Sequence, residues 1–367
     1  MSERGNQFLR WADRYLGIPL VFTLGILSKR QKNFIQKPQR IGILATAAIG
    51  DTILLSAILK DLRAHEPQAQ ITLFVGKSNE AIAKLMCPVD QIVCLPVSRP
   101  DSAIKKIRNS GHFNWWLDFG PWPRLNAFLS YWARADYRVG FSSPGQHRHF
   151  IYQQVVEHRN DCHEIENLRR LLSVFKIKSE SLPHYHNERT KKKSSKDFFE
   201  IAIHMFPGGY MAHFKEWHPH NWVDLINRLT ARGYRVVLTG APVDASRAEL
   251  ILRQCEFPKQ IRNFAGQMSL QQTANLLSDA DLVISVNTGI MHLAAACGVP
   301  LIALNGPTSS LRWGPLGDQT KTLNLNATSP SAGCLHLGFE YDKKDPNSLD
   351  TISVKQVEDA VEKMLKC

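Results

Sequence analysis

The chain has 367 residues, of which 44% are hydrophobic and 21% are charged. This length favours two domains over one, and this composition excludes disordered, collagen-like and coiled-coil proteins. Seven scattered cysteines without a C-x-x-C pair argue against a disulfide framework and a zinc ribbon, and they favour a reducing compartment. The net charge is +12, so the distribution of charge along the chain is informative.

Half of the excess positive charge lies in residues 1–40, where eight basic residues and two acidic ones give a net +6. Within this region an uncharged stretch, 15–28, lies between Arg14 and Lys29. It is too short to span a bilayer, which takes about 20 residues of helix, and no small-x-small cleavage site of a signal peptide follows it. We therefore expect residues 1–39 to form an amphipathic segment that lies in the interface of an anionic membrane. The alternative is a helix packed on the protein's own surface.

From Arg40 onward, short apolar runs alternate with helical patterns, which is typical of parallel βαβ units. The predicted strands of this first half are 41–45, 71–75, 91–95 and 115–119, and its predicted helices are 52–65, 80–86 and 124–133. Polar and charged residues from 179 to 197, including the run Lys191–Lys193, then interrupt the pattern. No zinc-finger, RRM or basic-zipper pattern accompanies this run, so it indicates a solvated linker rather than a nucleic-acid site.

The same alternation starts again after the interruption. The predicted strands are 199–204, 235–239, 282–286 and 300–304, and the predicted helices are 222–232, 245–254, 269–278, 291–297 and 353–366. The sequence therefore predicts an α/β protein with two Rossmann-like halves and parallel sheets, in which ligands bind beyond the carboxyl ends of the strands. The expected boundaries are 1–39 for the amphipathic segment, 40–180 for the N-terminal domain, 181–197 for the basic linker, 198–346 for the C-terminal domain and 347–367 for the closing helix.

Asp51 is the candidate catalytic residue of the first half. It stands in the loop 47–51, between a strand and a helix, and no G-x-G-x-x-G dinucleotide pattern is present. One interpretation makes Asp51 the N-cap of the helix. The other makes it a carboxylate that the helix dipole keeps ionised and that accepts a proton from an attacking hydroxyl.

Two loops of the second half suit phosphate groups. Gly208 follows the first strand and precedes Lys215, a combination that offers backbone N–H groups and a positive charge to a diphosphate, although a plain Pro-Gly turn explains the glycine equally well. In 285–300 a strand ends, a helix opens at Gly289, and His292 lies in its first turn. Phosphate oxygens accept from the N–H groups of such a turn, with Thr288 and His292 donating beside them. The alternative is a structural histidine.

Several motifs together resemble one enzyme family. They are Ile49-Gly50-Asp51, Phe206-Pro207-Gly208 with Lys215-Glu216-Trp217, Thr239-Gly240-Ala241-Pro242 with Asp244, Phe264-Ala265-Gly266, Asn287-Thr288-Gly289-Ile290-Met291-His292 and Asn305-Gly306-Pro307-Thr308. From Arg40 to the final helix the chain resembles glycosyltransferase family 9, the heptosyltransferase family of lipopolysaccharide assembly. The resemblance implies a GT-B fold, with two facing Rossmann-like domains, and inverting, metal-independent transfer from a nucleotide sugar, which is ADP-heptose in known members.

The resemblance also implies roles for single residues. Asp51 matches the family's catalytic base, Lys215 its lysine near the donor diphosphate, and Asp244 an acidic residue that meets the nucleotide ribose, although Asp244 equally suits the N-cap of the helix at 245. The remaining donor-binding candidates are Gly208, Asn287, Thr288, Gly289 and His292. The chain departs from the family at two places, because the family often has Asp where Asn287 stands and Lys-x-Trp-Pro where this chain has Lys215-Glu216-Trp217-His218-Pro219.

The expected function is transfer of heptose from ADP-heptose to a lipopolysaccharide core or related glycolipid, on the cytoplasmic face of the inner membrane. The expected partners are the donor, a glycolipid or oligosaccharide acceptor and an anionic membrane surface, without nucleic acid, cofactor or metal. Asp279-Ala280-Asp281 has a metal-binding D-x-D form, but it precedes a strand and so lies away from the ligand-binding edge. The alternatives are a GT-B transferase for another nucleotide sugar, or a non-catalytic protein that binds a nucleotide sugar and a membrane.

Overall fold

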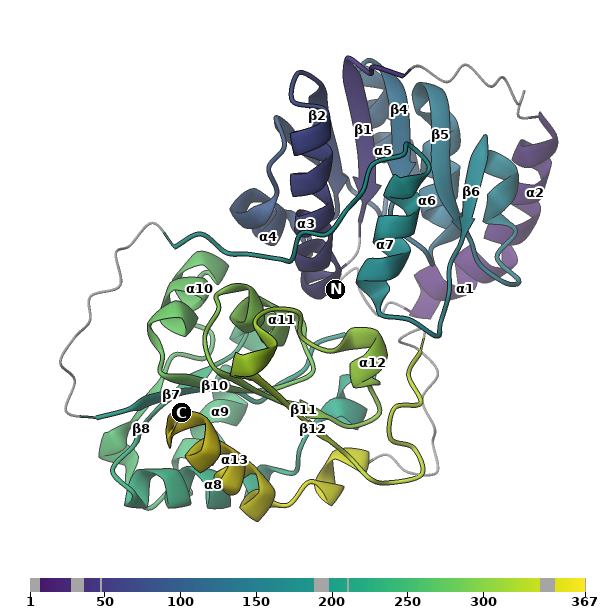
Figure 1. Cartoon of the computed structure of the whole chain (residues 1–367). Helices are drawn as coiled ribbons and strands as arrows, with labels where there is room; N and C mark the ends of the chain where they lie inside the picture. Colours follow the sequence, from purple (N-terminus) through teal and green to yellow (C-terminus); the bar gives the residue numbers. More distant parts are fainter. Residues whose placement is uncertain are drawn as a thin grey trace. The chain divides into compact units, whose positions relative to one another are not determined.

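A computed structural model describes residues 7–27, 36–46, 48–187, 198–209, 211–336 and 347–366 of the chain. The chain divides into two compact units, Met1–Ser181 and Leu182–Cys367, each with its own sheet (Figure 1). The basic run Lys191–Lys193 and the residue Lys29 lie outside the described residues.

The N-terminal unit contains a six-stranded parallel sheet in the order β3-β2-β1-β4-β5-β6. Its strands are β1 (Arg40–Ala45), β2 (Gln70–Val75), β3 (Gln91–Cys94), β4 (His112–Asp118), β5 (Arg134–Ser142) and β6 (Gln154–Glu157). Its helices include α3 (Ile49–His65), α4 (Glu80–Met86), α5 (Pro100–Asn109), α6 (Arg124–Trp132) and α7 (Glu164–Ser173), with the 3-10 turn η1 (Arg148–Ile151). The sequence analysis missed β5 and β6, because polar residues interrupt the apolar ones in both strands and most of their residues are partly or fully exposed, so they lack the long apolar run of a buried strand.

Aromatic packing fixes the centre of this sheet. The Trp116 ring lies 5.2 Å from the ring of Phe74 and 5.5 Å from that of Phe113, and all three side chains are fully buried. On the neighbouring strand, a Cβ at Gly42 would overlap the Trp116 ring. Glycine is therefore required there for Trp116 to pack against β1, and the strand that leads to Asp51 is held rigidly.

Two short helices before β1 pack on the N-terminal unit and form one bent helical segment, the α1–α2 segment, because Leu16 N donates to Ala12 O and Leu16 O accepts from Leu20 N. They are α1 (Gln7–Tyr15) and α2 (Gly17–Leu27). Val21 is fully buried against Ala127, Ile151 and Tyr152. One face of the α1–α2 segment thus packs on the protein's own surface, as the second sequence interpretation expected. Within the described ranges, no helix has the length and apolar character needed to cross a membrane.

The C-terminal unit repeats the arrangement with the strand order β12-β11-β10-β7-β8-β9, again all parallel. Its strands are β7 (Glu200–His204), β8 (Arg235–Thr239), β9 (Ile261–Asn263), β10 (Leu282–Val286), β11 (Leu301–Asn305) and β12 (Thr322–Asn326). Its helices are α8 (Pro219–Ala231), α9 (Ala245–Leu252), α10 (Leu270–Asp279), α11 (Gly289–Ala296), α12 (Ser310–Trp313) and α13 (Val354–Lys366). The closing helix α13 lies beside α8 (Figure 1), where Glu358 pairs with Arg228 and Arg232.

The strand order creates the same feature in both sheets. The first strand of each unit lies beside the fourth, so that β1 pairs with β4 and β7 pairs with β10. Chain connections leave in opposite directions at such a point, which opens a crevice beyond the carboxyl ends of the two strands. The predicted α/β class with parallel sheets is therefore confirmed, and the loops after β1, β4, β7 and β10 are the places for ligands.

Candidate active site

Asp51 lies in the first turn of α3, directly beyond β1. The helix begins at Ile49, three residues earlier than the sequence analysis placed it, and its N-cap residue is Ala48. The interpretation of Asp51 as an N-cap is therefore wrong. A carboxylate in the first turn is stabilised by the partial positive charge of the helix N-terminus, which suits a group that must stay ionised until it accepts a proton.

Two buried asparagines hold the loop that leads to Asp51. Thr46 Oγ1 donates to Asn126 Oδ1 at 2.8 Å, and Asn126 belongs to α6. On the other side, Asn79 Nδ2 donates to Ala45 O and to Thr52 Oγ1, both at 2.8 Å. The sequence analysis singled out neither asparagine, because each is remote in sequence from the loop that it holds.

A fully buried ion pair lies behind Asn126. Arg148 Nη2 donates to Asp118 Oδ2 at 2.7 Å, the Tyr152 hydroxyl donates to the same oxygen at 2.5 Å, and neither Arg148 nor Asp118 is exposed. Asn126 Nδ2 donates to the other carboxylate oxygen at 3.3 Å. Burial raises the pKa of Tyr152 well above its usual value, so this hydroxyl remains a hydrogen-bond donor. The network connects the end of β4, at the crevice, with the start of α6.

The C-terminal unit gathers the predicted donor-binding residues at the carboxyl edge of neighbouring strands. Gly208 follows β7, Asp244 follows β8, and Asn287 follows β10, whose loop continues with Thr288, Gly289 and His292 into α11. Parallel strands bring these loops to one edge of the sheet. Gly208 is exposed, and its neighbour Gly209 has a φ of 101°, a conformation that favours glycine.

Lys215 ends a short 3-10 turn, η2 (Ala212–Lys215), and the side chains of the two residues that follow it are held in place. Glu216 accepts from both terminal nitrogens of Arg247, at 3.0 and 2.5 Å. The Trp217 ring is buried, and its Nε1–H donates to Ile352 O at 3.0 Å. The backbone of Lys215 is thus held in place from its carboxyl side.

The turn at the start of α11 is capped from within. Thr288 is its N-cap residue, and its Oγ1 accepts from the N–H groups of Ile290 at 3.2 Å and Met291 at 3.4 Å. The Thr288 hydroxyl thus accepts from two of the N–H groups that the sequence analysis expected to bind phosphate. Gly289 is the first helical residue, and the His292 side chain is buried in the same turn.

Asp244 stabilises its own turn. Its Oδ2 accepts from Ala241 N at 2.9 Å and closes the 3-10 turn η3 (Pro242–Asp244). It occupies the N-cap position of α9 but makes no side-chain hydrogen bond to that helix. Burial raises the pKa of Asp244 above its usual value.

The D-x-D sequence lies at the opposite edge of the sheet. Asp281 Oδ2 accepts from Glu200 N at 2.7 Å, at the amino ends of β7 and β10. In the described part of the chain, no group of three or more His, Cys, Asp or Glu side chains is placed to hold a metal ion.

Comparison with known proteins identifies the family. The model of glycosyltransferase family 9 (heptosyltransferase) matches residues 125–337, which is more than half of the chain. The chain belongs to glycosyltransferase family 9. It is therefore a glycosyltransferase, as the motifs predicted.

Three relatives of this family 9 enzyme extend the likeness over most of the chain. The lipopolysaccharide heptosyltransferase 2 of Salmonella typhimurium is 24% identical over 309 residues, which cover 78% of this chain and 88% of that protein. A family 9 glycosyl transferase from Veillonella parvula has a TM-score of 0.74 at 19% identity, covering 89% of this chain and 97% of its own. The ADP-heptose LPS heptosyltransferase II of E. coli has a TM-score of 0.70 at 20% identity, covering 89% and 98%. The predicted GT-B fold class is confirmed.

The structure explains the asparagine at a position where the family often has an aspartate. In this family 9 enzyme, Asn287 Nδ2 donates to Asn305 Oδ1 at 2.8 Å and to Trp313 O at 3.0 Å. Asn305 Nδ2 in turn donates to Asn324 Oδ1 at 3.0 Å. A carboxylate at position 287 would face two acceptor oxygens and could donate to neither, so this position requires an amide. The three asparagine side chains together connect the end of β10 to β11 and β12.

A buried histidine of this family 9 enzyme supports the same edge of the sheet. His204 ends β7, and its Nδ1 lies 3.0 Å from Thr239 Oγ1 at the end of β8. Burial lowers the pKa of His204 to about 4. The imidazole is therefore neutral at neutral pH, beneath the loops that carry Gly208 and Asp244.

Proposed function

We propose that this enzyme transfers heptose from ADP-heptose to a lipopolysaccharide core or related glycolipid, with inversion and without a resident metal ion. The observation that carries the proposal is the gathering of Gly208, Asp244, Thr288 and Gly289 at the carboxyl edge of three neighbouring strands. This is the edge at which α/β proteins bind nucleotides. The names of the similar heptosyltransferases support the choice of sugar.

In this proposal, the C-terminal unit binds the nucleotide sugar. Lys215 and the opening turn of α11 at Gly289 lie beside the diphosphate. Negative charge builds on the diphosphate as it leaves the sugar, and a fixed cation and a helix N-terminus stabilise that charge. These groups supply the stabilisation that a divalent cation gives in other transferases.

The N-terminal unit binds the acceptor in this proposal, and Asp51 acts as the general base. The acceptor oxygen attacks the anomeric carbon of the heptose and loses its proton to the Asp51 carboxylate. A new carbon–oxygen bond forms while the bond to the diphosphate breaks, and this single displacement inverts the anomeric configuration. ADP leaves with the electron pair of the broken bond.

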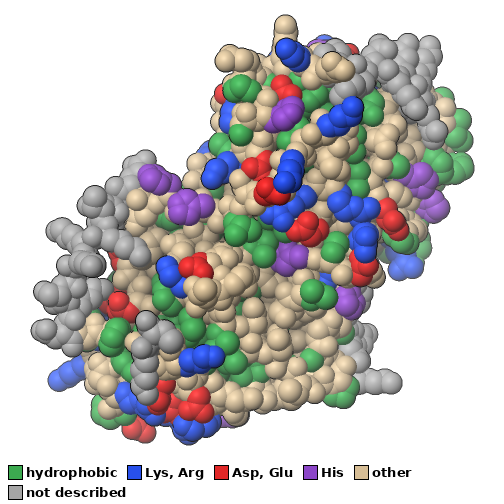
Figure 2. All heavy atoms as spheres, in the orientation of Figure 1, with side chains coloured by type: hydrophobic (Ala, Val, Ile, Leu, Met, Phe, Trp, Pro, Cys, Tyr) green, Lys and Arg blue, Asp and Glu red, His purple; other side chains and the backbone are tan. Residues whose placement is uncertain are grey.

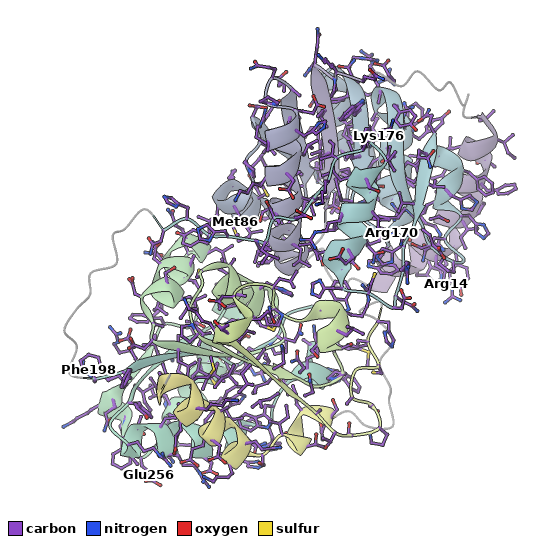
Figure 3. The ribbon with its side chains drawn as sticks, in the orientation of Figure 1. Arg14, Met86, Arg170, Lys176, Phe198 and Glu256 are labelled. Carbon is purple, nitrogen blue, oxygen red and sulfur yellow. The ribbon has the colours of Figure 1, made fainter. Side chains whose placement is uncertain are left out.

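A glycolipid acceptor places the reaction at a membrane, and we propose that the α1–α2 segment contacts the anionic cytoplasmic surface of the inner membrane. The exposed fractions of its outward apolar side chains lie between 52% and 72%, at Trp11, Tyr15, Leu16, Ile26 and Leu27. Hydrophobic side chains line the margin of the unit where α2 lies (Figure 2). Arg14 lies at the same margin (Figure 3). Exposed aromatic and aliphatic side chains beside cations suit a membrane interface.

The test is nucleotide release by the purified full-length enzyme. ADP-heptose, ADP-glucose and a UDP-sugar are supplied in turn with a core acceptor, and released nucleoside diphosphate is measured. We expect release with ADP-heptose that depends on the acceptor and persists in EDTA, and a loss of about 10²- to 10⁴-fold in Asp51→Asn, the usual contribution of a general base. Turnover with the UDP-sugar alone would favour a GT-B transferase that uses another nucleotide sugar. Donor binding without turnover would favour a non-catalytic protein that binds a nucleotide sugar.

A further inference from the structure

The loop between β1 and α3 has few means of holding itself in place. Among its described residues, Ala48 has no polar side chain, and Thr46 directs its hydroxyl to another element. The loop nevertheless sets the position of Asp51, which lies in the first turn of α3. Its geometry therefore depends on the elements packed beside it.

Asn79 and Asn126 supply that support from opposite sides of β1. Asn79 precedes α4, after the neighbouring strand β2, and Asn126 lies in α6, after the other neighbour, β4. Their exposed fractions are 0% and 1%. A buried amide with satisfied hydrogen bonds holds its partners firmly, because breaking one bond leaves a polar group without water or protein to replace it.

Asn126 is itself held in one orientation. Its Nδ2 donates to Asp118, which Arg148 and Tyr152 hold from the other side. A Cβ at Gly120 would overlap the Asn126 amide. The amide therefore has one place to lie, with Oδ1 accepting from Thr46.

We propose that Asn126 is a positioning residue for the transfer reaction. It holds Thr46, and through Thr46 the loop that places Asp51 against the acceptor hydroxyl, while Asn79 holds the other side. The proposal rests on the role of Asp51 as the base. A displacement of about 1 Å costs as much as 10²-fold in rate, so the loss of this single hydrogen bond is measurable in turnover.

The experiment removes the hydrogen bond from the loop side, where folding is least at risk. Thr46→Val deletes the hydroxyl at nearly constant volume, and Thr46→Ser keeps it. We expect Thr46→Val to lower kcat about 10- to 100-fold with little change in the KM for ADP-heptose or in ADP affinity, and Thr46→Ser to recover most of the loss. The matched control is Thr72→Val in β2, because the buried Thr72 hydroxyl has no hydrogen-bond partner among the described residues. The control keeps wild-type kcat.

Hydrogen exchange gives a readout that does not depend on activity. Residues 44–55 should exchange faster in Thr46→Val than in the wild type, and Thr72→Val should leave their exchange unchanged. If Asp51→Asn lowers turnover but Thr46→Val matches Thr46→Ser in kcat and exchange, the positioning proposal is wrong and the base assignment stands. If Asp51→Asn lowers turnover less than tenfold, Asp51 is not the general base, and the catalytic part of the positioning proposal is wrong as well.

Discussion

Asn287 shows how one buried amide orders the carboxyl edge of the C-terminal sheet. Its Nδ2 group faces two acceptors, Asn305 Oδ1 and Trp313 O. Asn287→Asp puts a carboxylate there and should lower the free energy of unfolding by about 1 to 3 kcal/mol, the cost of an unpaired buried polar group. Denaturant unfolding measures the change.

The matched control for this prediction is Asn324→Asp. Asn324 accepts through its Oδ1 from Asn305 Nδ2, and a carboxylate keeps that acceptor. We expect Asn324→Asp to stay close to the wild type. If both variants lose the same free energy of unfolding, the hydrogen bonds that the Asn287 amide donates are not the reason for the loss, and the prediction is wrong.

His204 makes stability depend on pH. Because burial lowers its pKa to about 4, the unfolded chain binds a proton at higher pH than the folded chain does. The contribution of the neutral imidazole to the free energy of unfolding is complete above pH 6.5, and it is lost as the pH falls from 6.5 to about 4. At 1.36 kcal/mol per pKa unit, the loss is on the order of 3 kcal/mol.

Urea unfolding of wild type and His204→Asn at pH 7 and pH 4.5 tests this contribution. The difference in the free energy of unfolding between the two proteins should be smaller at pH 4.5 than at pH 7. The wild type loses stability when its imidazole must be protonated, whereas the variant has no imidazole at this position. A constant difference for His204→Asn would contradict the prediction.

At the scale of elements, the α1–α2 segment caps the start of α6. Pro123 precedes this helix and offers no side-chain cap. Asp13 supplies one from α1, since its Oδ1 accepts from Leu125 N at 3.0 Å and its Oδ2 accepts from Arg124 Nη1 at 3.2 Å. Helix α6 also carries Asn126, so the α1–α2 segment and the loop before Asp51 both contact this helix.

Replacing this cap should destabilise the N-terminal unit. Asp13→Ala removes the acceptor for Leu125 N and leaves Arg124, whose side chain is 7% exposed, without its carboxylate. We expect a loss of about 1 to 3 kcal/mol in the free energy of unfolding. Asp161→Ala, which breaks the exposed pair with Arg159, is the control and should cost well under 1 kcal/mol. A loss no larger than that of the control would mean that the cap contributes little.

Strands and loops with local signals could be predicted from the sequence. Asp51 and the turn from Asn287 to His292 were found because polar residues follow apolar runs, and the structure places both beyond strands. The asparagine supports were missed because Asn126 lies 80 residues from its partner Thr46. Edge strands were missed for a different reason. β9, like β5 and β6, lacks a continuous buried run, and β12 is half-exposed along most of its length.

At the scale of the whole molecule, membrane binding is best tested by point changes on the surface of the α1–α2 segment. Removing residues 1–38 would uncover the partners of Val21 and take Asp13 from Arg124, so it would damage the fold as well. Changing Trp11, Leu16 and Ile26 together to Gln alters exposed side chains only. We expect this variant to bind anionic vesicles at least tenfold more weakly, since each apolar side chain contributes about 1.5 to 3 kcal/mol when fully buried.

The same enzyme provides the control for vesicle binding. Leu250→Gln changes a side chain of α9 that is 59% exposed, and it should bind vesicles as the wild type does. Binding of the wild type should weaken as salt rises, because salt screens the attraction of basic residues to anionic lipid beyond about 10 Å at 0.1 M. Vesicle binding that is unchanged in the triple variant would place the membrane contact elsewhere.

The hydrogen bond from Trp217 to Ile352 affects the order in which parts of the chain fold during translation. The two residues are 135 positions apart, and Ile352 lies in the final part of the chain. The N-terminal unit is complete when Ser181 leaves the ribosome, and domains fold in that order as they emerge. The segment beside Lys215, by contrast, waits for its anchor until Ile352 has been synthesised. A nascent chain therefore carries a folded N-terminal unit well before the Lys215 segment is held in place.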